Sequence, residues 1–456
     1  MLKNSKKYLI TFFGLMIIFN VLLFLVCLFP SDLIENNVIE SANTLYEQGA
    51  YYLVSDAGEV FNDSYTDSVI INECYSIDNE TPYESYMKAR KNYKKGQTIV
   101  EAEESTGEGV TANYFEEIGA EDVSSSHYDS IGELADFLNG NIKTSLNYGR
   151  YWHGYLVLYR PILLFTNITG IRTINKVAFW LLLFVLMYLL LKRFNYIIAV
   201  LYAIVILING YITAAFSLES TPIFLLSIIA SIVLLVFIEK IKDFYLFSFI
   251  VGCIASYVDY LTVPLVSLGI PLSIYLLYTL NNRNWKENIK FVVISSLAWL
   301  GGYAGSWIFK WAQYDLTISG MSMLDIGFTQ SFYRMRRKNE NAIEATVFSQ
   351  IKYCITNAVF ITVIFSVILG FLGKLKKLVK TESSRIFDAN SISFLLIALM
   401  PICWYLVLAN HTILHSYFVY RHAVLFSLGL LLAFYTGIFE INTIKLGKKK
   451  WILTKL

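Results

Sequence analysis

A series of long apolar runs constrains this chain more than any other feature. The first occupies residues 8–29, and the others lie between residues 178 and 439. Because a helix needs about 20 apolar residues to cross the hydrocarbon layer of a bilayer, such runs predict transmembrane helices. The composition agrees, since 56% of the residues are hydrophobic and only 16% are charged. We therefore expect an all-α polytopic membrane protein with about ten transmembrane helices. The later runs are 178–191, 196–216, 223–238, 244–258, 261–280, 291–308, 353–372, 392–408 and 423–439.

The distribution of charge predicts how the chain is threaded through the membrane. Residues 1–30 carry three lysines ahead of the first run, which ends in the sequence CLFP without a small-residue cleavage site. This pattern favours a retained signal anchor over a cleaved signal peptide. Every second connection is basic, and so is the tail 441–456. The positive-inside rule then predicts a multi-pass protein of the cell membrane with both termini in the cytoplasm.

Two long segments fall outside the membrane in this topology. Residues 31–176 hold no other run of spanning length and form a large first extracytoplasmic loop, followed by helices 2–7 in residues 177–308. Residues 309–352 form a second such loop, and helices 8–10 occupy residues 353–440. This second loop is basic against the expected bias, and phosphate binding is one reason for cations there. The cluster consists of Arg334, Arg336, Arg337 and Lys338.

Aromatic residues crowd the end of the first loop, in the segment 148–161 with the sequence YGRYWHGYLVLYRP. Tyr and Trp prefer the headgroup layer of a bilayer, so an interfacial helix is expected near residues 152–165. Arg150, His153 and Arg160 lie among the rings, beside Trp152. Cations at that depth suit a lipid phosphate or a phosphate-linked sugar, and snorkelling anchors of an interfacial helix are the alternative.

Acidic residues provide the candidate catalytic groups. Asp63 and Asp67 are four positions apart, so a helix would place both carboxylates on one face, where they suit deprotonation of a hydroxyl or binding of a divalent cation. A solvated surface is the alternative. Glu219 and Asp259 are single acids in connections so short that each carboxylate lies near the membrane boundary. They are expected to be functional, or to cap a turn.

The last outside loop carries His411 and His415 on one helical stripe, with Arg421 beyond them. The spacing lacks the acid of a metalloprotease motif, so no metal ligand is assigned. Hydrogen bonds to sugar hydroxyls or to a pyrophosphate are expected, with interfacial anchoring as the alternative. The five cysteines form no metal or disulfide pattern, and the balance of 37 basic to 35 acidic residues gives no reason to expect a nucleic-acid partner.

The chain resembles membrane glycosyltransferases of the C superfamily. The matching features are the signal-anchor-like first helix, the large first outside loop, the aromatic segment 148–161 and the late outer sequence NHTILHSYFVYR. The resemblance implies a polyprenyl-phosphate-linked sugar as donor, an essential acid in the first loop and outer loops that hold the donor. It also implies a cell-envelope glycan or lipid as acceptor and membrane lipids as surroundings.

The leading hypothesis is therefore an inverting glycosyltransferase that acts on the outer face. Asp67 is the first choice as general base, with Asp63 beside it, because an apolar run follows Asp67 and docks it onto the core. A divalent cation is a possible cofactor. The alternatives are a transporter or flippase of lipid-linked glycans, and a polymerase or ligase of such glycans. The expected substrate-binding residues are Arg150, Trp152, His153, Arg160, Glu219, Asp259, Arg334, Arg336, Arg337, His411, His415 and Arg421.

Overall fold

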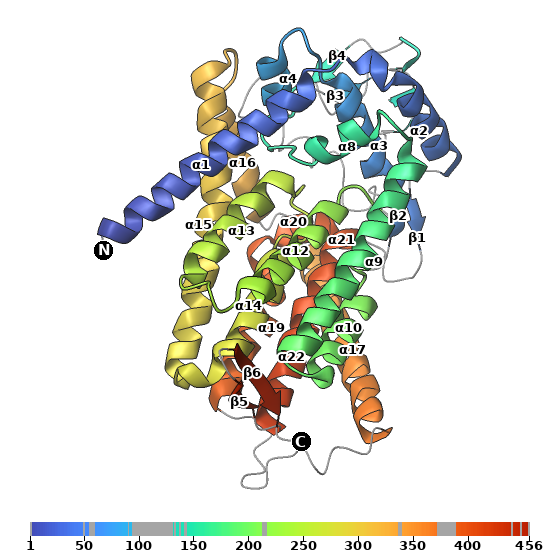
Figure 1. The fold of residues 1–456 in the computed structure, drawn as a ribbon. Coiled ribbons are helices and arrows are strands. Elements are labelled where there is room, and N and C mark those ends of the chain that lie inside the picture. The colour runs from blue at the N-terminus through green and yellow to red at the C-terminus, as the bar shows by residue number, and fades with distance from the viewer. Residues whose placement is uncertain are drawn as a thin grey trace.

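The computed structural model is mainly helical, with three short two-stranded antiparallel sheets in its described part (Figure 1). Six helices of that part are long and apolar enough to cross a membrane. The membrane-protein class predicted from the sequence is supported to that extent. The structure describes residues 2–48, 51–53, 60–89, 91–93, 131, 134–135, 138–140, 144–211, 217–335, 340–371, 389–438, 441–446 and 449–454.

Each of the ten apolar runs coincides largely with one helix. The match is closest at α13, which has the bounds expected from its run. Four of the ten, α10, α12, α13 and α22, contain 13, 17, 15 and 16 residues and are shorter than the six membrane-length helices. Among those six, α14 and α19 reach 18 and 19 residues together with the turns η2 Leu280–Asn282 and η3 Ala389–Ser391. The ten are α1 Leu2–Cys27, α9 Ile168–Arg193, α10 Tyr196–Ile208, α12 Thr221–Phe237, α13 Phe244–Val258, α14 Leu265–Thr279, α15 Trp285–Thr317, α17 Glu340–Phe371, α19 Ile392–Val407 and α22 Ala423–Ile438.

Polar side chains set several helix starts. The Asn167 side chain accepts hydrogen bonds from two N–H groups at the start of α9, and Asn195 and Asp243 each accept from one at the start of α10 and α13. At α15, Asn284 and Glu287 form a reciprocal capping box. At α9 and α15 the caps let the helix begin before the apolar run does, because a cap needs only unpaired N–H groups.

The segment 309–352, which was expected to form a loop, is mostly helical where the structure describes it. The segment 309–352 contains the end of α15, the helix α16 (Met323–Met335) and the start of α17. Hydropathy predicts which residues lie in the membrane, but it does not predict where a helix ends. A helix readily continues through polar residues where one of its faces is in contact with water.

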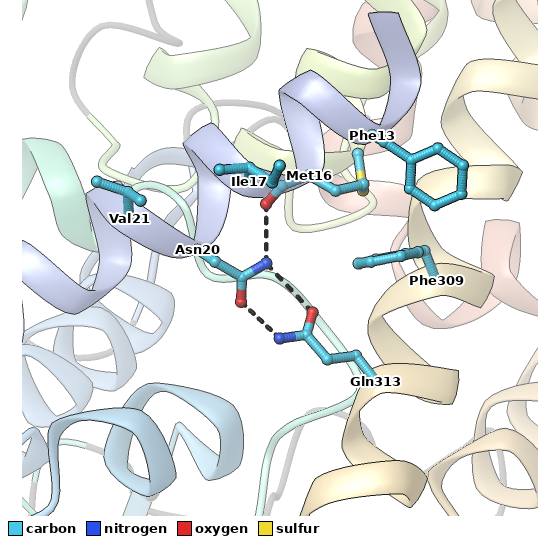
Figure 2. Close-up of a pocket in the computed structure, with 7 residues that line it drawn as sticks. All are labelled: Phe13, Met16, Ile17, Asn20, Val21, Phe309 and Gln313. Atoms are coloured by element: carbon cyan, nitrogen blue, oxygen red, sulfur yellow. Dashed lines mark hydrogen bonds between the residues drawn. The ribbon is translucent and has the colours of Figure 1, made fainter. Parts of the chain in front are cut away.

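The helices pack closely through small residues. A Cβ atom on Gly252 of α13 would overlap the carbonyl oxygen of Trp299 on α15, and one on Gly302 would overlap the carbonyl of Phe249. The two backbones therefore touch, as in membrane interfaces built on small residues. Further along, α15 meets α1 along an apolar groove of about 270 Å³. There the side-chain amides of Asn20 and Gln313 donate to each other at 3.2 and 2.7 Å (Figure 2).

The described part of the segment 31–167 forms a compact layer at one end of the bundle, opposite the hairpin β5–β6 (Ile441–Leu446 and Lys449–Thr454) (Figure 1). The helix α2 shows why it folds there: its buried residues Val38, Ala42 and Leu45 recur at helical spacing and face α3 and α9. The other elements of the layer are η1 Ser31–Leu33, α2 Glu35–Gln48, α3 Ser64–Ser76, α4 Pro82–Lys88, α8 Leu156–Ile162, β1 Tyr51–Leu53 with β2 Val60–Asp63, and β3 Lys91–Tyr93 with β4 Thr144–Leu146.

At the opposite end, the segment expected as a basic tail contains the strands β5 (Ile441–Leu446) and β6 (Lys449–Thr454). They pair in antiparallel register, with Ile444 opposite Trp451.

The rings of the aromatic segment 148–161 are mostly buried inside the protein. An interfacial position for the helix expected near residues 152–165 stays a prediction. Tyr151, Trp152, Tyr155 and Tyr159 are at most 5% exposed. The Trp152 indole donates to the carbonyl of Ser306 at 3.0 Å, and its ring meets Phe19 and Tyr257 edge to face. Only the short helix α8 forms in this region. Buried protein neighbours supply the ring contacts that the sequence analysis assigned to lipid headgroups.

Candidate functional site

Helix α3 carries two fully buried acids, Asp67 in its first turn and Glu73 in its last. Six positions correspond to about 240° of rotation around a helix, so the two carboxylates point in different directions. Each is therefore surrounded by different neighbours. The two surroundings, together with the residues next to them, contain eight of the 14 site residues predicted from the sequence.

Asp67 belongs to a saturated ion pair. Its Oδ2 accepts hydrogen bonds from Nε and Nη2 of Arg172 at 3.0 and 2.6 Å, and its Oδ1 accepts from the Leu218 N–H at 2.7 Å. Burial raises the pKa of Asp67, and the Arg172 guanidinium opposes that rise. Both carboxylate oxygens are occupied, so the role of general base stays a prediction without geometric support. Asp63 ends β2, and its side chain lies outside the described residues.

The turn between α10 and α12 holds Glu219, one of the predicted site residues, and is contacted by another, Arg421 of η4 (Tyr420–His422). Its backbone is fixed at Leu218, whose carbonyl accepts from the Tyr159 hydroxyl at 2.8 Å. The neighbouring Ser220 hydroxyl lies 3.4 Å from Glu219 Oε1 and accepts from Arg421 Nη1 at 3.3 Å. Glu219 and Arg421 are 3% and 2% exposed. We call this group the turn cluster, and it consists of Asp67, Arg172, Leu218, Glu219, Ser220 and Arg421.

Glu73 lies among phenols and an imidazole. Its Oε2 accepts from the Tyr155 hydroxyl and lies 3.2 Å from His153 Nδ1, and its Oε1 is 3.4 Å from the Tyr260 hydroxyl. His153 Nε2 lies 2.8 Å from the carbonyl oxygen of Tyr148. A carbonyl only accepts, so Nε2 carries a proton and Nδ1 is the nitrogen that faces Glu73. We call this group the Glu73 cluster, and it consists of Glu73, Tyr148, His153, Tyr155 and Tyr260.

A strained turn positions the His153 side chain next to Glu73. The φ angle of His153 is 56°, in the left-handed region that few non-glycine residues adopt. The next residue, Gly154, donates its N–H to the Tyr257 carbonyl at 2.8 Å, and a Cβ there would overlap the Tyr257 ring. The turn therefore requires glycine at position 154, and strain of this kind is often found at functional sites.

Two arginines adjoin the Glu73 cluster. The Arg150 guanidinium lies 4.7 Å from the Tyr148 ring centre and 5.3 Å from that of Tyr151. Arg334, on α16, donates to the Tyr151 hydroxyl at 2.8 Å. The Tyr151 ring stacks on Tyr260 with centres 5.3 Å apart. Both arginines are partly exposed. Arg336 and Arg337, predicted beside Arg334, lie outside the described residues.

Two histidines lie close to these arginines. His411 belongs to α20 (Ala409–Leu414), and His415 lies between α20 and α21 (Ser416–Val419), with ring centres 4.6 Å apart. His411 Nε2 is 3.0 Å from the Leu261 carbonyl. Burial, His415 and Arg334 lower the pKa of His411 well below its usual value.

Burial, Arg334 and Arg150 likewise lower the pKa of His415 to about 3. Positive charge therefore resides on the arginines, and both imidazoles are neutral. We call these residues the cation cluster, and it consists of Arg150, Arg334, His411 and His415.

Asp259 stabilises a turn, which is the structural alternative to a functional role that the sequence suggests for it. Its Oδ1 accepts from the N–H and the hydroxyl of Thr262 at 3.1 and 2.7 Å, which closes the turn before α14. Its Oδ2 lies 3.4 Å from the Tyr303 hydroxyl. Burial raises the pKa of Asp259 to about 6. A functional role for the carboxylate stays a prediction.

Arg160 and Trp152 contact other parts of the protein and belong to none of the three clusters. The five N–H groups of Arg160 meet five acceptors, among them the carbonyls of Cys74 at 2.9 Å and Ile77 at 2.9 Å. Arg160 ties the end of α1 to the end of α3, and it has no donor left for a phosphate. The fully buried Trp152 packs against α1 and α13. We therefore leave both residues out of the proposed site.

Several buried polar residues were missed by the sequence analysis. Glu73 interrupts the apolar run that follows Asp67, and Lys310 lies inside a helix of membrane length. Lys310 is fully buried, 3.4 Å from the carbonyls of Tyr86 and Met87. A charge within an apolar run was an available signal for both. For Arg172 and Tyr260 the sequence offers no comparable signal.

Among the described residues, no group of three or more His, Cys, Asp and Glu side chains comes together as a metal site would require. A divalent cofactor stays a prediction. No family model, curated protein or solved structure matches the chain.

Proposed function

We propose that the protein is an integral-membrane glycosyltransferase, of the kind found in the C superfamily, that moves a sugar from a polyprenyl phosphate to a cell-envelope acceptor. The observation that carries the proposal is the contact between the cation cluster and the Glu73 cluster. Two partly exposed arginines there are each linked to the buried Glu73 carboxylate through two tyrosines. Arg150 is linked through Tyr148 and Tyr260, and Arg334 through Tyr151 and Tyr260. Cations next to a proton-accepting group are the combination that sugar transfer from a phosphate needs.

The chemistry of each cluster fits one half of such a reaction. Guanidinium groups bind phosphate oxygens through paired N–H donors, so Arg150 and Arg334 would hold the donor phosphate and offset its charge as it leaves. The neutral histidines His411 and His415 would offer hydrogen bonds without repelling a sugar. The tyrosine rings and hydroxyls of the Glu73 cluster suit the faces and hydroxyls of a sugar.

We further propose that all ten long or apolar helices cross the cell membrane, with both termini in the cytoplasm. The four shorter helices pack among the six longer ones, which supports their placement at the same depth. In this topology the Glu73 and cation clusters lie on the outer face. The basic connections described above then face the cytoplasm.

A transporter or flippase of lipid-linked glycans is the second candidate, because it would use the same arginines without chemistry. A transport pathway needs polar groups along the length of several helices. Among the described residues, the buried Asp, Glu, Lys and Arg side chains gather at the end that carries the clusters, which favours the transferase. They are Asp67, Glu73, Arg160, Arg172, Glu219, Asp259, Lys310 and Arg421. A polymerase or ligase of lipid-linked glycans would not need the first loop.

The test is an assay of membranes that contain the protein, supplied with labelled polyprenyl-phosphate hexoses and pentoses and scored for consumption of the donor. We expect the double variant Arg150→Gln/Arg334→Gln to consume donor about 100-fold more slowly, because two charge-assisted hydrogen bonds are lost. Arg193→Gln is the matched control: Arg193 pairs with Glu239 at 3.0 Å, away from both clusters.

Three results would contradict the transferase. One is a folded wild-type protein that consumes none of these donors, and another is a double variant as active as the control. The third is movement of intact labelled donor across vesicles without cleavage, which would identify a flippase.

A further inference from the structure

The Glu73 cluster has a buried floor and a more open rim. Glu73, His153 and Tyr155 are at most 1% exposed, whereas Tyr148 and Tyr260 are partly exposed. A substrate held by Arg150 therefore meets the two rim tyrosines and cannot touch the acid. Any proton that reaches Glu73 has to pass through one of the hydroxyl groups above it.

Tyr260 is placed for that passage. Its hydroxyl lies 3.4 Å from Glu73 Oε1 and is also a hydrogen-bond partner of the Tyr148 side chain. The Tyr148 ring in turn faces the Arg150 guanidinium. The other carboxylate oxygen, Oε2, accepts from the Tyr155 hydroxyl and lies 3.2 Å from His153 Nδ1. The two oxygens of Glu73 thus differ, because one is fixed by the floor of the cluster and the other faces the rim.

We propose that Tyr260 and Glu73 form a proton relay that deprotonates the acceptor hydroxyl during sugar transfer, an inference that rests on the proposed function. The acceptor oxygen bonds to the anomeric carbon as the bond from that carbon to the phosphate oxygen breaks, and the phosphate keeps the electron pair. The acceptor proton moves to the Tyr260 oxygen while the Tyr260 proton moves to Glu73 Oε1. Tyr260 is neutral before and after the step.

The surroundings support a concerted transfer through the tyrosine. Its enclosed position and the nearby Glu73 carboxylate raise the pKa of Tyr260 well above the ordinary value. Tyr260 therefore does not form a stable phenolate, and its hydroxyl releases one proton as it accepts another. Tyr155 acts as a positioning residue: its hydroxyl, which also contacts His153 Nδ1, donates to Oε2 and keeps Oε1 directed toward Tyr260.

The experiment uses the full chain in membranes that supply the acceptor, with labelled polyprenyl-phosphate sugar and single-turnover conditions. Tyr260→Phe and Glu73→Gln are each expected to lower the rate about 100-fold, the usual scale of general-base catalysis. Binding of unlabelled polyprenyl phosphate to the purified variants, measured by thermal stabilisation, is expected to stay at the wild-type level. Tyr202→Phe is the matched control, because Tyr202 is fully buried and its hydroxyl bonds only Ser273, at 2.7 Å, among the contacts described.

A second measurement separates a relay from direct acceptance by Glu73. When two protons move in the rate-limiting step, the rate plotted against the deuterium fraction of the solvent is curved, and when one moves it is linear. We expect a curve for the wild type and a line for Tyr260→Phe.

The outcomes are distinct. If the wild type consumes no donor, the proposed function fails and the relay fails with it. If the wild type is active but Tyr260→Phe keeps its rate, only the relay is overturned, and the same holds if the wild-type plot is linear. If Glu73→Gln does not fold, Tyr260→Phe decides the matter, because it removes a single hydroxyl from a partly exposed residue.

Discussion

The two ends of helix α3 present the same chemical group in opposite settings. Asp67 and Glu73 are both fully buried acids. Asp67 has an arginine and a backbone N–H on its oxygens, whereas the contacts of Glu73 come from phenols and an imidazole. Burial alone therefore does not mark a catalytic acid. The kind of partner distinguishes them.

The difference has a physical basis in what each partner does with a proton. An arginine only donates hydrogen bonds and keeps its charge, so the ion pair between Arg172 and Asp67 cannot pass a proton on. Hydroxyls and imidazole nitrogens both donate and accept, so the network around Glu73 can pass a proton on. We infer that the turn cluster stabilises the fold and that the Glu73 cluster serves the reaction.

The largest expected effect is on stability, at the Asp67 end. Asp67→Ala leaves the Arg172 guanidinium buried without its partner, and loss of one member of a buried pair lowers the free energy of unfolding by about 3–5 kcal/mol. Denaturant unfolding of the purified protein in detergent measures the change. The fraction that remains folded is expected to transfer sugar at the wild-type rate.

The control for Asp67→Ala removes both charges together. Replacing a buried ion pair by apolar residues of similar volume is often neutral, so Asp67→Leu/Arg172→Met is expected to regain most of the lost stability. The structural role inferred for the Asp67 end of α3 is contradicted if an Asp67 variant folds with full stability yet transfers no sugar. That result would restore Asp67 as the general base.

These settings also explain what the sequence predicts well and what it does not. The ten helices follow from apolar runs, a local property, and α13 has the bounds expected for it. The site depends on distant pairs instead. Arg172 is 105 positions from Asp67, His153 is 80 positions from Glu73, and Tyr260 is 187 positions from Glu73. No local pattern connects such residues.

Several predicted site residues did come together, namely Arg150, His153, Arg334, His411 and His415. They could be predicted as a group because the expected topology placed their loops at one end of the bundle. Arg160 has the same local sequence signals as Arg150, with rings on either side. Its full set of five protein acceptors depends on the end of α1 and the end of α3, and a count of nearby aromatic residues does not reveal it.

A pH dependence is expected from Asp259, a third buried acid that has neither an arginine nor a histidine among its described partners. Its pKa is raised from 3.8 to about 6 by burial. The folded state therefore binds the proton more tightly than the unfolded state does. The stabilisation from this group is complete below pH 4 and is lost as the pH rises to about 6, an effect of about 3 kcal/mol for a shift of two units.

Asp259→Asn isolates that effect, because the amide still accepts from Thr262 and does not titrate. We expect the unfolding free energy of the wild type to fall by about 3 kcal/mol relative to Asp259→Asn between pH 4 and pH 7. A constant difference between the two proteins over that range would show that Asp259 has an ordinary pKa in the fold.

A smaller effect distinguishes the arginines of the two clusters. Arg334→Gln is expected to raise the KM for a polyprenyl-phosphate donor about tenfold, equivalent to about 1.4 kcal/mol, because one charge-assisted hydrogen bond is lost. Arg421→Gln, in the turn cluster, is expected to lower the thermal unfolding temperature without changing KM. A rise in KM for Arg421→Gln alone would reverse the roles assigned to the two clusters.

The finest comparison uses two tyrosines four positions apart. Tyr155 donates to Glu73 and Tyr159 donates to the Leu218 carbonyl of the turn cluster, and both are 1% exposed. Removal of either hydroxyl is expected to lower the free energy of unfolding by about 1 kcal/mol. Only Tyr155→Phe is expected to slow sugar transfer, by about fivefold, because Glu73 Oε2 loses one of the contacts that direct Oε1 toward Tyr260. Equal transfer rates in the two variants, measured at matched folded fractions, would mean that the Glu73 end is as purely structural as the Asp67 end.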